Sequence, residues 1–279
     1  MILMYHNIDH DAGFNTVSKS NFIKQLLFLK NNNYKIIALD KYLELVVNNK
    51  LSSSIVTITF DDAYINFAEI VFSILKEYQI PVTLFVPVGF IDKYNEWDAI
   101  VSQTRLKIMN WENLKILANN DLITIGSHGF SHCSLGLSDK EKILFEVSES
   151  KRILEETLHI LIRHFSFPYG QKKDISFTAI QALKDNSYVS ACSTNWCINN
   201  KSKDLFRLNR IEIEPADNIE KFESKVKTYY HPKFFKQILK NILSIVPEKN
   251  IRTKVLQRVA FTNPSLKAGV SKSLVLIGL

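Results

Sequence analysis

Short apolar runs alternate along the chain with longer segments of helical period, and this alternation limits the possible folds more than any other feature. The pattern is typical of βα units around a parallel sheet or barrel. Seven or eight such strands favour a barrel over an open sheet. We expect strands at Ile2–Tyr5, Lys35–Leu39, Ile55–Phe60, Val82–Val86, Leu122–Ile125, His164–Phe167, Tyr188–Ala191 and Leu205–Ile213.

Two of the intervening helices have recognisable starts. Asp40 is expected to cap a helix over residues 41–48, and Ser138-Asp139-Lys140-Glu141 has the capping-box spacing before a helix that reaches about Leu158. In barrels of parallel strands, active sites gather at the carboxyl ends of the strands. Functional residues are therefore expected directly after the apolar runs.

Positive charge is concentrated at the end of the chain. Residues 221–279 hold 12 Lys and Arg against 2 acidic residues, whereas residues 1–220 hold 23 against 26. The chain has 279 residues, 46% of them hydrophobic, which is enough for one main domain with a sizeable core. We predict a barrel domain over residues 1–220 and a basic helical extension over residues 221–279.

The extension contains apolar residues at helical spacing from Phe234 to Val246, with lysines between them, which predicts a basic amphipathic helix before Pro247. This helix either packs on the barrel with its lysines in water, or lies on an anionic membrane surface. In the second case each lysine contributes about 1 kcal/mol. Nucleic acid is not expected as a partner, because no stacking platform or binding motif accompanies the charge.

The sequence shows no sign of export. No apolar stretch approaches the roughly 20 residues that cross a bilayer, and residues 1–6 lack the features of a signal peptide. We therefore expect a cytoplasmic protein, with peripheral contact at the inner face of the membrane if the basic helix binds there. Cys133, Cys192 and Cys197 are expected to be reduced thiols that hold no zinc.

Residues with useful chemistry follow several of the expected strands. His128 and His132 are spaced so that one helical turn could hold one ion, and Asp62 could complete a set of two imidazoles and a carboxylate. Neighbouring strand residues point to opposite faces, so Asp61 and Asp62 can share a site only if the chain turns there. Taken singly, the aspartates could also form a solvated turn or cap a helix from Ala63, and His6 could be a core residue.

Three motifs follow one another along the chain. They are Thr59-Phe60-Asp61-Asp62, Ser127-His128-Gly129-Phe130-Ser131-His132 and Phe165-Ser166-Phe167-Pro168-Tyr169-Gly170. In this order they resemble the first three motifs of the polysaccharide deacetylase family, the NodB-homology or carbohydrate esterase family 4 enzymes. The resemblance spans roughly residues 1–215.

The resemblance implies an α/β fold, a distorted (β/α)7 TIM-like barrel, and a metal-dependent amide hydrolase that acts on N-acetylated sugars. Position by position, Asp61 resembles the catalytic base, whereas Asp62, His128 and His132 resemble the metal ligands. Tyr169 matches the turn whose backbone N–H is expected to help hold the oxyanion.

Two departures from the family pattern shift the expected roles. The third motif usually begins with an arginine that orients the base, but Ser166 stands there, and Arg210 is the candidate replacement. The late Leu-x-His motif that supplies the general acid is missing after residue 170. The early Tyr5-His6 pair resembles instead the permuted branch of the family, which includes enzymes that act on poly-N-acetylglucosamine. This makes His6 the candidate acid.

The expected function is removal of an N-acetyl group from an amino sugar, polymeric or lipid-linked, in the biosynthesis of envelope polysaccharide, lipopolysaccharide or polyprenyl-linked sugar. Zinc is the expected metal, although two histidines and one carboxylate do not choose among zinc, cobalt, nickel and manganese. Two alternatives stay open. One is a catalytically weakened carbohydrate-binding protein, suggested by Ser166 and the missing late histidine, and the other is a deformylase or other amidase on the same fold.

Overall fold

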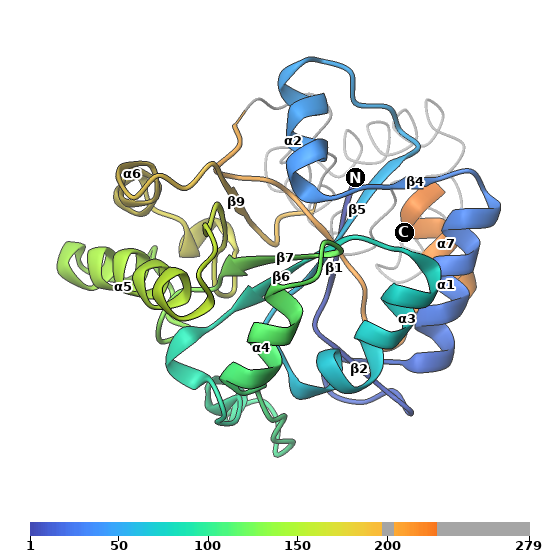
Figure 1. Ribbon diagram of the computed structural model, residues 1–279, viewed down its shortest axis with the longest axis horizontal. Coiled ribbons are helices and arrows are strands. Elements are labelled where there is room, and N and C mark those ends of the chain that lie inside the picture. The colour runs from blue at the N-terminus through green and yellow to red at the C-terminus, as the bar shows by residue number, and fades with distance from the viewer. Residues whose placement is uncertain (197–203, 228–279) are drawn as a thin grey trace, which may run out of the picture. The chain divides into compact units, whose positions relative to one another are not determined.

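One sheet of eight parallel strands organises the part of the chain that the computed structural model describes, residues 1–196 and 204–227 (Figure 1). Its strand order is β10-β1-β5-β6-β7-β8-β9, and β4 pairs with β5. A separate small sheet contains β2 (Asn7–Asp9) and β3 (Thr16–Ser18). The strands of the main sheet are β1 (Ile2–Tyr5), β4 (Lys35–Ile36), β5 (Ile55–Phe60), β6 (Val82–Val86), β7 (Ile123–Ser127), β8 (His164–Ser166), β9 (Ser190–Cys192) and β10 (Ile211–Glu212).

The segment of residues 205–213, which contains β10, joins the two ends of this sheet. Leu208 forms a parallel bridge with Cys192 of β9, and Ile211 of the same segment pairs with Leu3 of β1. The segment predicted as one strand, residues 205–213, is therefore divided between two neighbours. This connection closes the curled sheet, and the predicted α/β barrel fold is confirmed.

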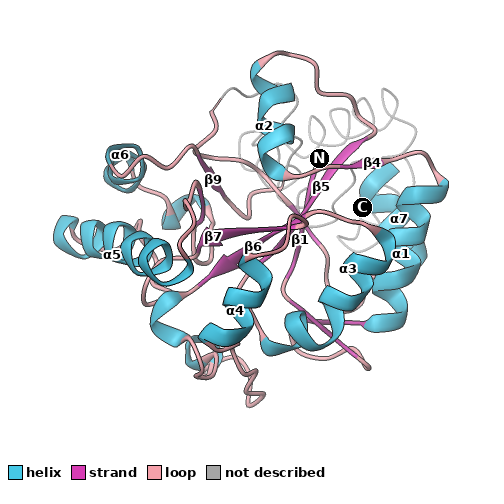
Figure 2. Ribbon diagram, viewed as in Figure 1, coloured by secondary structure: helices cyan, strands magenta, loops and turns pink. Residues whose placement is uncertain are grey.

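Helices α1 to α6 surround the strands of residues 1–219 (Figure 2). This arrangement covers the outer face of the sheet and explains why whole strands are buried, including every residue of β1 and β6. The helices are α1 (Lys19–Asn31), α2 (Leu39–Val47), α3 (Phe72–Tyr78), α4 (Trp111–Ala118), α5 (Lys140–Leu158), α6 (Phe177–Asp185) and α7 (Ile219–Lys227).

The predicted helix starts need three corrections. Helix α2 begins after Ala38, and Asp40 lies in its first turn, where it contacts His164 instead of capping the helix. The cap of α5 is Asp139, which accepts a hydrogen bond from the Lys142 N–H, so the predicted capping box of residues 138–141 is wrong. No helix begins at Ala63, because a π-helical turn (Phe67–Val71) leads into α3.

The described chain falls into two units, residues 1–219 and a second unit that begins at Glu220. The predicted basic helix of residues 234–246 and Cys197 lie outside the described residues. The domain boundary after residue 220, the membrane contact and the cellular location stay predictions. Cys133 and Cys192 are free thiols. No helix within residues 1–196 and 204–227 is long and apolar enough to cross a membrane.

Candidate active site

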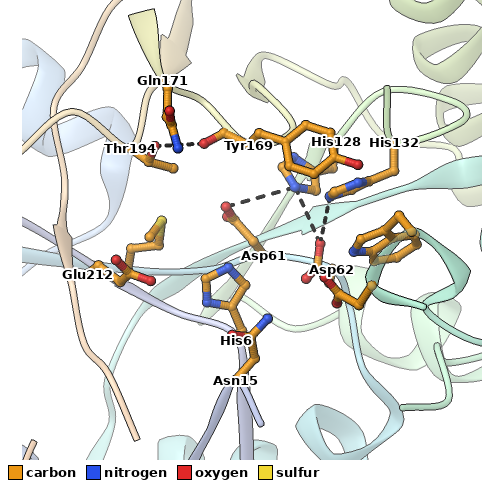
Figure 3. Close-up of a pocket in the computed structure, with 13 residues that line it drawn as sticks. His6, Asn15, Asp61, Asp62, His128, His132, Tyr169, Gln171, Thr194 and Glu212 are labelled. Atoms are coloured by element: carbon orange, nitrogen blue, oxygen red, sulfur yellow. Dashed lines mark hydrogen bonds and ion pairs between the residues drawn. The ribbon is translucent and has the colours of Figure 1, made fainter. Parts of the chain in front are cut away.

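A polar pocket of about 200 Å³ opens at the carboxyl ends of the barrel strands (Figure 3). It gathers residues that directly follow β1, β5 and β7, together with residues of the turn after β8, as the position of active sites in parallel barrels predicts. Two segments that the sequence did not single out, around Trp97 and around Thr194, complete its wall. The lining residues are Met4, His6, Asn15, Asp61, Asp62, Trp97, Asp98, His128, His132, Tyr169, Gln171, Thr194 and Glu212.

The chain turns sharply where the twin aspartates lie. The N–H of Asp61 still follows the sheet by donating to the carbonyl of Tyr5 at 3.0 Å. Asp62 and Ala63 then take left-handed φ angles of 71° and 53°, a conformation that L-residues adopt at a cost. This turn brings both carboxylates to the same pocket, as the sequence required for a shared site, and neither carboxylate caps a helix.

The two histidines of the second motif also converge, but not on a helix. Gly129 and His132 have left-handed φ angles of 76° and 51°, so residues 128–132 form a loop, and the expected helical turn is wrong. The loop nevertheless brings the two imidazole rings to a centroid distance of 4.9 Å. The two histidines therefore lie close together as predicted, although with a different backbone conformation.

Asp62, His128 and His132 offer ligand atoms that all lie within 4.8 Å of one another. Oδ1 of Asp62 is 3.4 Å from Nε2 of His128 and 3.3 Å from Nε2 of His132. This Oδ1 atom is buried and has no hydrogen-bond partner among the described residues. Two imidazoles and one carboxylate are a donor set that suits a divalent transition metal. The geometry therefore fits a metal site.

Further contacts orient these donors. Nδ1 of His128 lies 2.7 Å from the carbonyl oxygen of Ser166, which leaves Nε2 to face Asp62. The hydroxyl of Tyr64 donates to Oδ2 of Asp62 at 2.9 Å, which leaves Oδ1 for the ion. Tyr64 is buried and was not predicted from the sequence. Its only signal there is its place two residues after Asp62.

Burial and the short distances between these side chains shift the pKa values of all three candidate ligands. Burial alone would raise the pKa of Asp62, but the two imidazoles outweigh it and hold that pKa well below its ordinary value. Burial lowers the pKa of His132, which favours the neutral imidazole that a metal needs. Burial opposes charge on His128 as well, yet the carboxylates of Asp61 and Asp62 outweigh it and raise its pKa above the ordinary value.

Arg210, the predicted replacement for the missing motif arginine, contacts Asp61. Its guanidinium is fully buried and binds both carboxylate oxygens of Asp61 at 2.7 Å. The remaining N–H groups donate to Ser193 O, Thr59 Oγ1 and Ser166 Oγ, so all five donors are used. Burial would raise the pKa of Asp61, but Arg210 and then His128 more than compensate and lower it. Asp61 is therefore held ionised.

His6 and Tyr169 reach the same pocket from opposite sides of the aspartates in the view of Figure 3. His6 directly follows β1 and is half-buried. Tyr169 has a left-handed φ of 59°, and its carbonyl accepts a hydrogen bond from Thr194 Oγ1 at 2.7 Å. Within the described residues no acceptor contacts the Tyr169 N–H. All seven predicted site residues thus lie at one pocket or, for Arg210, directly behind it.

Two supports of His132 were missed by the sequence reasoning. Its ring stacks on Trp97 at a centroid distance of 4.0 Å and meets the edge of Tyr169 at 5.0 Å. The loop before it is held by Glu146 of α5, whose carboxylate accepts hydrogen bonds from the N–H groups of Phe130 and Ser131 and from the Ser131 hydroxyl. Glu146 is an acidic residue on an amphipathic helix, and only its complete burial marks it as special.

Comparison with known proteins agrees with this geometry. A family model described as polysaccharide deacetylase matches residues 48–189. The Bacillus subtilis (strain 168) protein YxkH, whose name places it among polysaccharide deacetylases, is 24% identical over 216 residues, 77% of this chain and 71% of the relative. Poly-beta-1,6-N-acetyl-D-glucosamine N-deacetylase of Staphylococcus aureus (strain MRSA252) is 25% identical over 174 residues, 60% of this chain and 58% of the relative. The chain thus spans less than two thirds of the latter protein.

Two solved structures share the fold. The Streptococcus pyogenes deacetylase PplD, solved in complex with acetate, has 23% identity and a TM-score of 0.66, and the match covers 81% of this chain and 97% of that one. IcaB from Ammonifex degensii has 19% identity and a TM-score of 0.68, with 81% and 94% covered. At these identities the likeness supports the fold of the barrel.

Proposed function

The chain belongs to the polysaccharide deacetylase family, and we propose that it is a metal-dependent hydrolase that removes the N-acetyl group from an amino sugar. The observation that carries this proposal is the arrangement of two aspartates with different partners. Asp62 faces two imidazoles, whereas Asp61 is held beside it by Arg210. One carboxylate is thus available for an ion and the other for a proton.

A metal held by Asp62, His128 and His132 would polarise the amide carbonyl and acidify water. The identity of the metal is part of the proposal. Zinc suits a small set of imidazole and carboxylate donors, although cobalt, nickel and manganese accept the same donors.

Asp61 is the proposed general base. It is ionised because Arg210 lowers its pKa, and it accepts three hydrogen bonds within the described residues, from two guanidinium nitrogens and the Ser166 hydroxyl. A carboxylate has about four lone-pair sites, so capacity remains for a proton taken from the attacking water. Because Arg210 and Ser166 hold the carboxylate from behind, its orientation is set before substrate binds.

His6 is the proposed general acid and Tyr169 the proposed oxyanion donor. An amine leaves an amide only when its nitrogen gains a proton, and His6 lines the pocket beside the aspartates without belonging to the ligand set. The Tyr169 N–H lies in a strained turn at the pocket, and such preorganised backbone donors stabilise the charge that develops on the carbonyl oxygen.

The proposed substrate is an N-acetylhexosamine, polymeric or lipid-linked, of envelope polysaccharide synthesis. The staphylococcal relative supports this choice by its name, which specifies a poly-N-acetylglucosamine substrate. A lipid-linked form at the inner face of the cytoplasmic membrane would match the basic segment of residues 221–279, so we include this location in the proposal.

Acetate release tests the function. The purified protein, stripped with chelator and reloaded with single metals, is assayed against free, polymeric and lipid-linked N-acetylhexosamines. We expect metal-dependent acetate release that falls about 10²- to 10⁴-fold in Asp61→Asn, while the metal content of that variant stays unchanged. Wild-type turnover in Asp61→Asn, or formate in place of acetate, would contradict the proposal.

A further inference from the structure

We propose that Asp98 is a specificity-determining residue that binds an ammonium group of an amino-sugar chain next to the acetamido group under attack. The inference rests on the proposed function and deepens it. It names the preferred substrate as a chain that already carries free amines, that is, a partly deacetylated one.

The carboxylate of Asp98 is held in the pocket wall. Asp98 ends the 3-10 turn η3 (Glu96–Asp98), and its Oδ2 accepts a hydrogen bond from Nδ2 of Asn95 at 2.9 Å. Asn95 is completely buried and is itself fixed, because its Oδ1 accepts from the Leu106 N–H at 2.7 Å. Asp98 is therefore a positioned group and not a freely rotating surface carboxylate.

This carboxylate keeps unused hydrogen-bonding capacity. Its Oδ1 has no hydrogen bond within the described residues, although the side chain is half-buried and partly withdrawn from water. A carboxylate offers about four lone-pair sites, and one that loses water gains from a charged or hydrogen-bonding partner. The structure thus leaves one side of Asp98 for a ligand in the pocket.

The charges around the pocket select the sign of that ligand. Its lining contains the carboxylates of Asp61, Asp62, Asp98 and Glu212, and no Lys or Arg among the described residues. Arg210 lies behind the pocket and is committed to Asp61. Asp61 is paired with Arg210, and Asp62 would be paired with the ion, so neither of these cations neutralises the carboxylate of Asp98. Such a carboxylate attracts a cationic group and repels a phosphate or uronate beside the scissile amide.

An amine is the cation that fits this substrate class. The proposed reaction converts each acetamido group into an amine, which is protonated at neutral pH. A chain that has reacted once therefore carries the ammonium group that a carboxylate at the pocket binds. A fully acetylated chain carries no ammonium group, so Oδ1 of Asp98 would then contact hydroxyl groups or water.

Binding and turnover together test the inference. Titration calorimetry at low salt would compare fully acetylated and half-deacetylated N-acetylglucosamine hexamers, using Asp61→Asn protein to prevent turnover. We expect the half-deacetylated hexamer to bind roughly fivefold more tightly, a preference that disappears when Asp98→Asn is added and weakens in high salt. In the turnover assay, Asp98→Asn should raise KM for the half-deacetylated hexamer and leave kcat unchanged.

Asp92→Asn is the matched control. Asp92 belongs to the same segment but its exposed carboxylate pairs with Lys107 outside the pocket, and its left-handed φ of 61° suits asparagine. This variant should keep the preference. Two results would overturn the inference. One is that the Asp61→Asn protein, with Asp98 intact, binds both hexamers with equal affinity. The other is that adding Asp98→Asn lowers the affinity for both hexamers by the same factor. Because binding is measured without turnover, that result differs from a failure of acetate release, which would contradict the proposed function instead.

Discussion

The guanidinium of Arg210 holds the carboxylate of Asp61 by two parallel hydrogen bonds, Nη1 to Oδ1 and Nη2 to Oδ2, each 2.7 Å long. Both side chains are buried; Asp61 directly follows β5 and Arg210 directly precedes β10, and the barrel brings them together across 149 positions of sequence. A bidentate pair of this kind sets orientation as well as charge. It therefore distinguishes Asp61, the proposed base, from Asp62, which faces the two imidazoles.

Arg210→Met should remove activity and stability together. It leaves Asp61 buried without its cation, which typically costs about 3–5 kcal/mol in the free energy of unfolding. Arg210→Lys keeps the charge but loses the two-point geometry, so it should fold better and still turn over slowly. Denaturant unfolding and kcat/KM measure both effects. Adding Asp61→Asn to Arg210→Met should restore part of the stability; no recovery would contradict the pairing.

His6→Gln should impair the departure of the amine. We expect kcat for an N-acetylated sugar to fall about 10²- to 10⁴-fold, because the leaving nitrogen loses its proton donor. An aryl acetate ester needs no such proton, so its hydrolysis should fall much less. The comparison of the two substrates is the measurement, and Tyr188→Phe, which changes a buried tyrosine outside the pocket lining, provides a control with normal kinetics. An equal loss on both substrates would count against the acid role.

Tyr64→Phe should weaken metal binding. Its hydroxyl fixes Oδ2 of Asp62 at 2.9 Å, and loss of such an orienting contact typically lowers metal affinity by about 10- to 100-fold. Competition with a chromophoric chelator would measure the change directly. Tyr188→Phe is again the control, since Tyr188 does not line the pocket and its hydroxyl donates to the Val147 carbonyl at 3.4 Å. Unchanged affinity in Tyr64→Phe would show that Asp62 needs no such support.

Glu146→Gln should loosen the histidine loop. It removes the negative charge of the carboxylate that accepts hydrogen bonds from the N–H groups of Phe130 and Ser131. Hydrogen bonds to charged groups each contribute about 1.5–3 kcal/mol to the free energy of unfolding. We expect lower stability and weaker metal binding, measured by denaturant unfolding and chelator competition. Glu149→Gln changes a partly exposed carboxylate of the same helix that pairs with Arg152 and not with the histidine loop, so it should have little effect.

The Glu146 contribution should also depend on pH. Burial would raise its pKa, but the hydrogen bonds from Ser131, Lys142 and Phe130 outweigh it and lower the pKa below the ordinary value of 4.5. A carboxylate with a lowered pKa stabilises the fold above its ordinary value and loses that effect as pH falls through the folded-state pKa. The stability gap between wild type and Glu146→Gln should therefore narrow below pH 4.5. A constant gap would contradict the charge-based account.

Much of the barrel could be predicted because local sequence controls it. The bounds of β1, β5 and β6 were predicted as observed. Each strand is a short, largely apolar run, the pattern typical of a strand that is buried on both faces of a sheet. Strands near the end were less regular. The segment of residues 205–213 pairs with two different neighbours, and a propensity pattern contains no information about such a division.

Asp62, His128 and His132 could be proposed from the sequence because their motifs lie at strand ends and parallel strands end at one face. The sequence by itself therefore determined the chemical groups, their order and the edge of the sheet at which they meet. Only the tertiary structure decided how they work together: the left-handed turns that aim both aspartates inward, the pairing of Arg210 with Asp61, and the support from Tyr64, Glu146 and Trp97. The physical reason is that these contacts join segments far apart in the chain or depend on rare backbone angles, so their energies exist only once the barrel has closed around them.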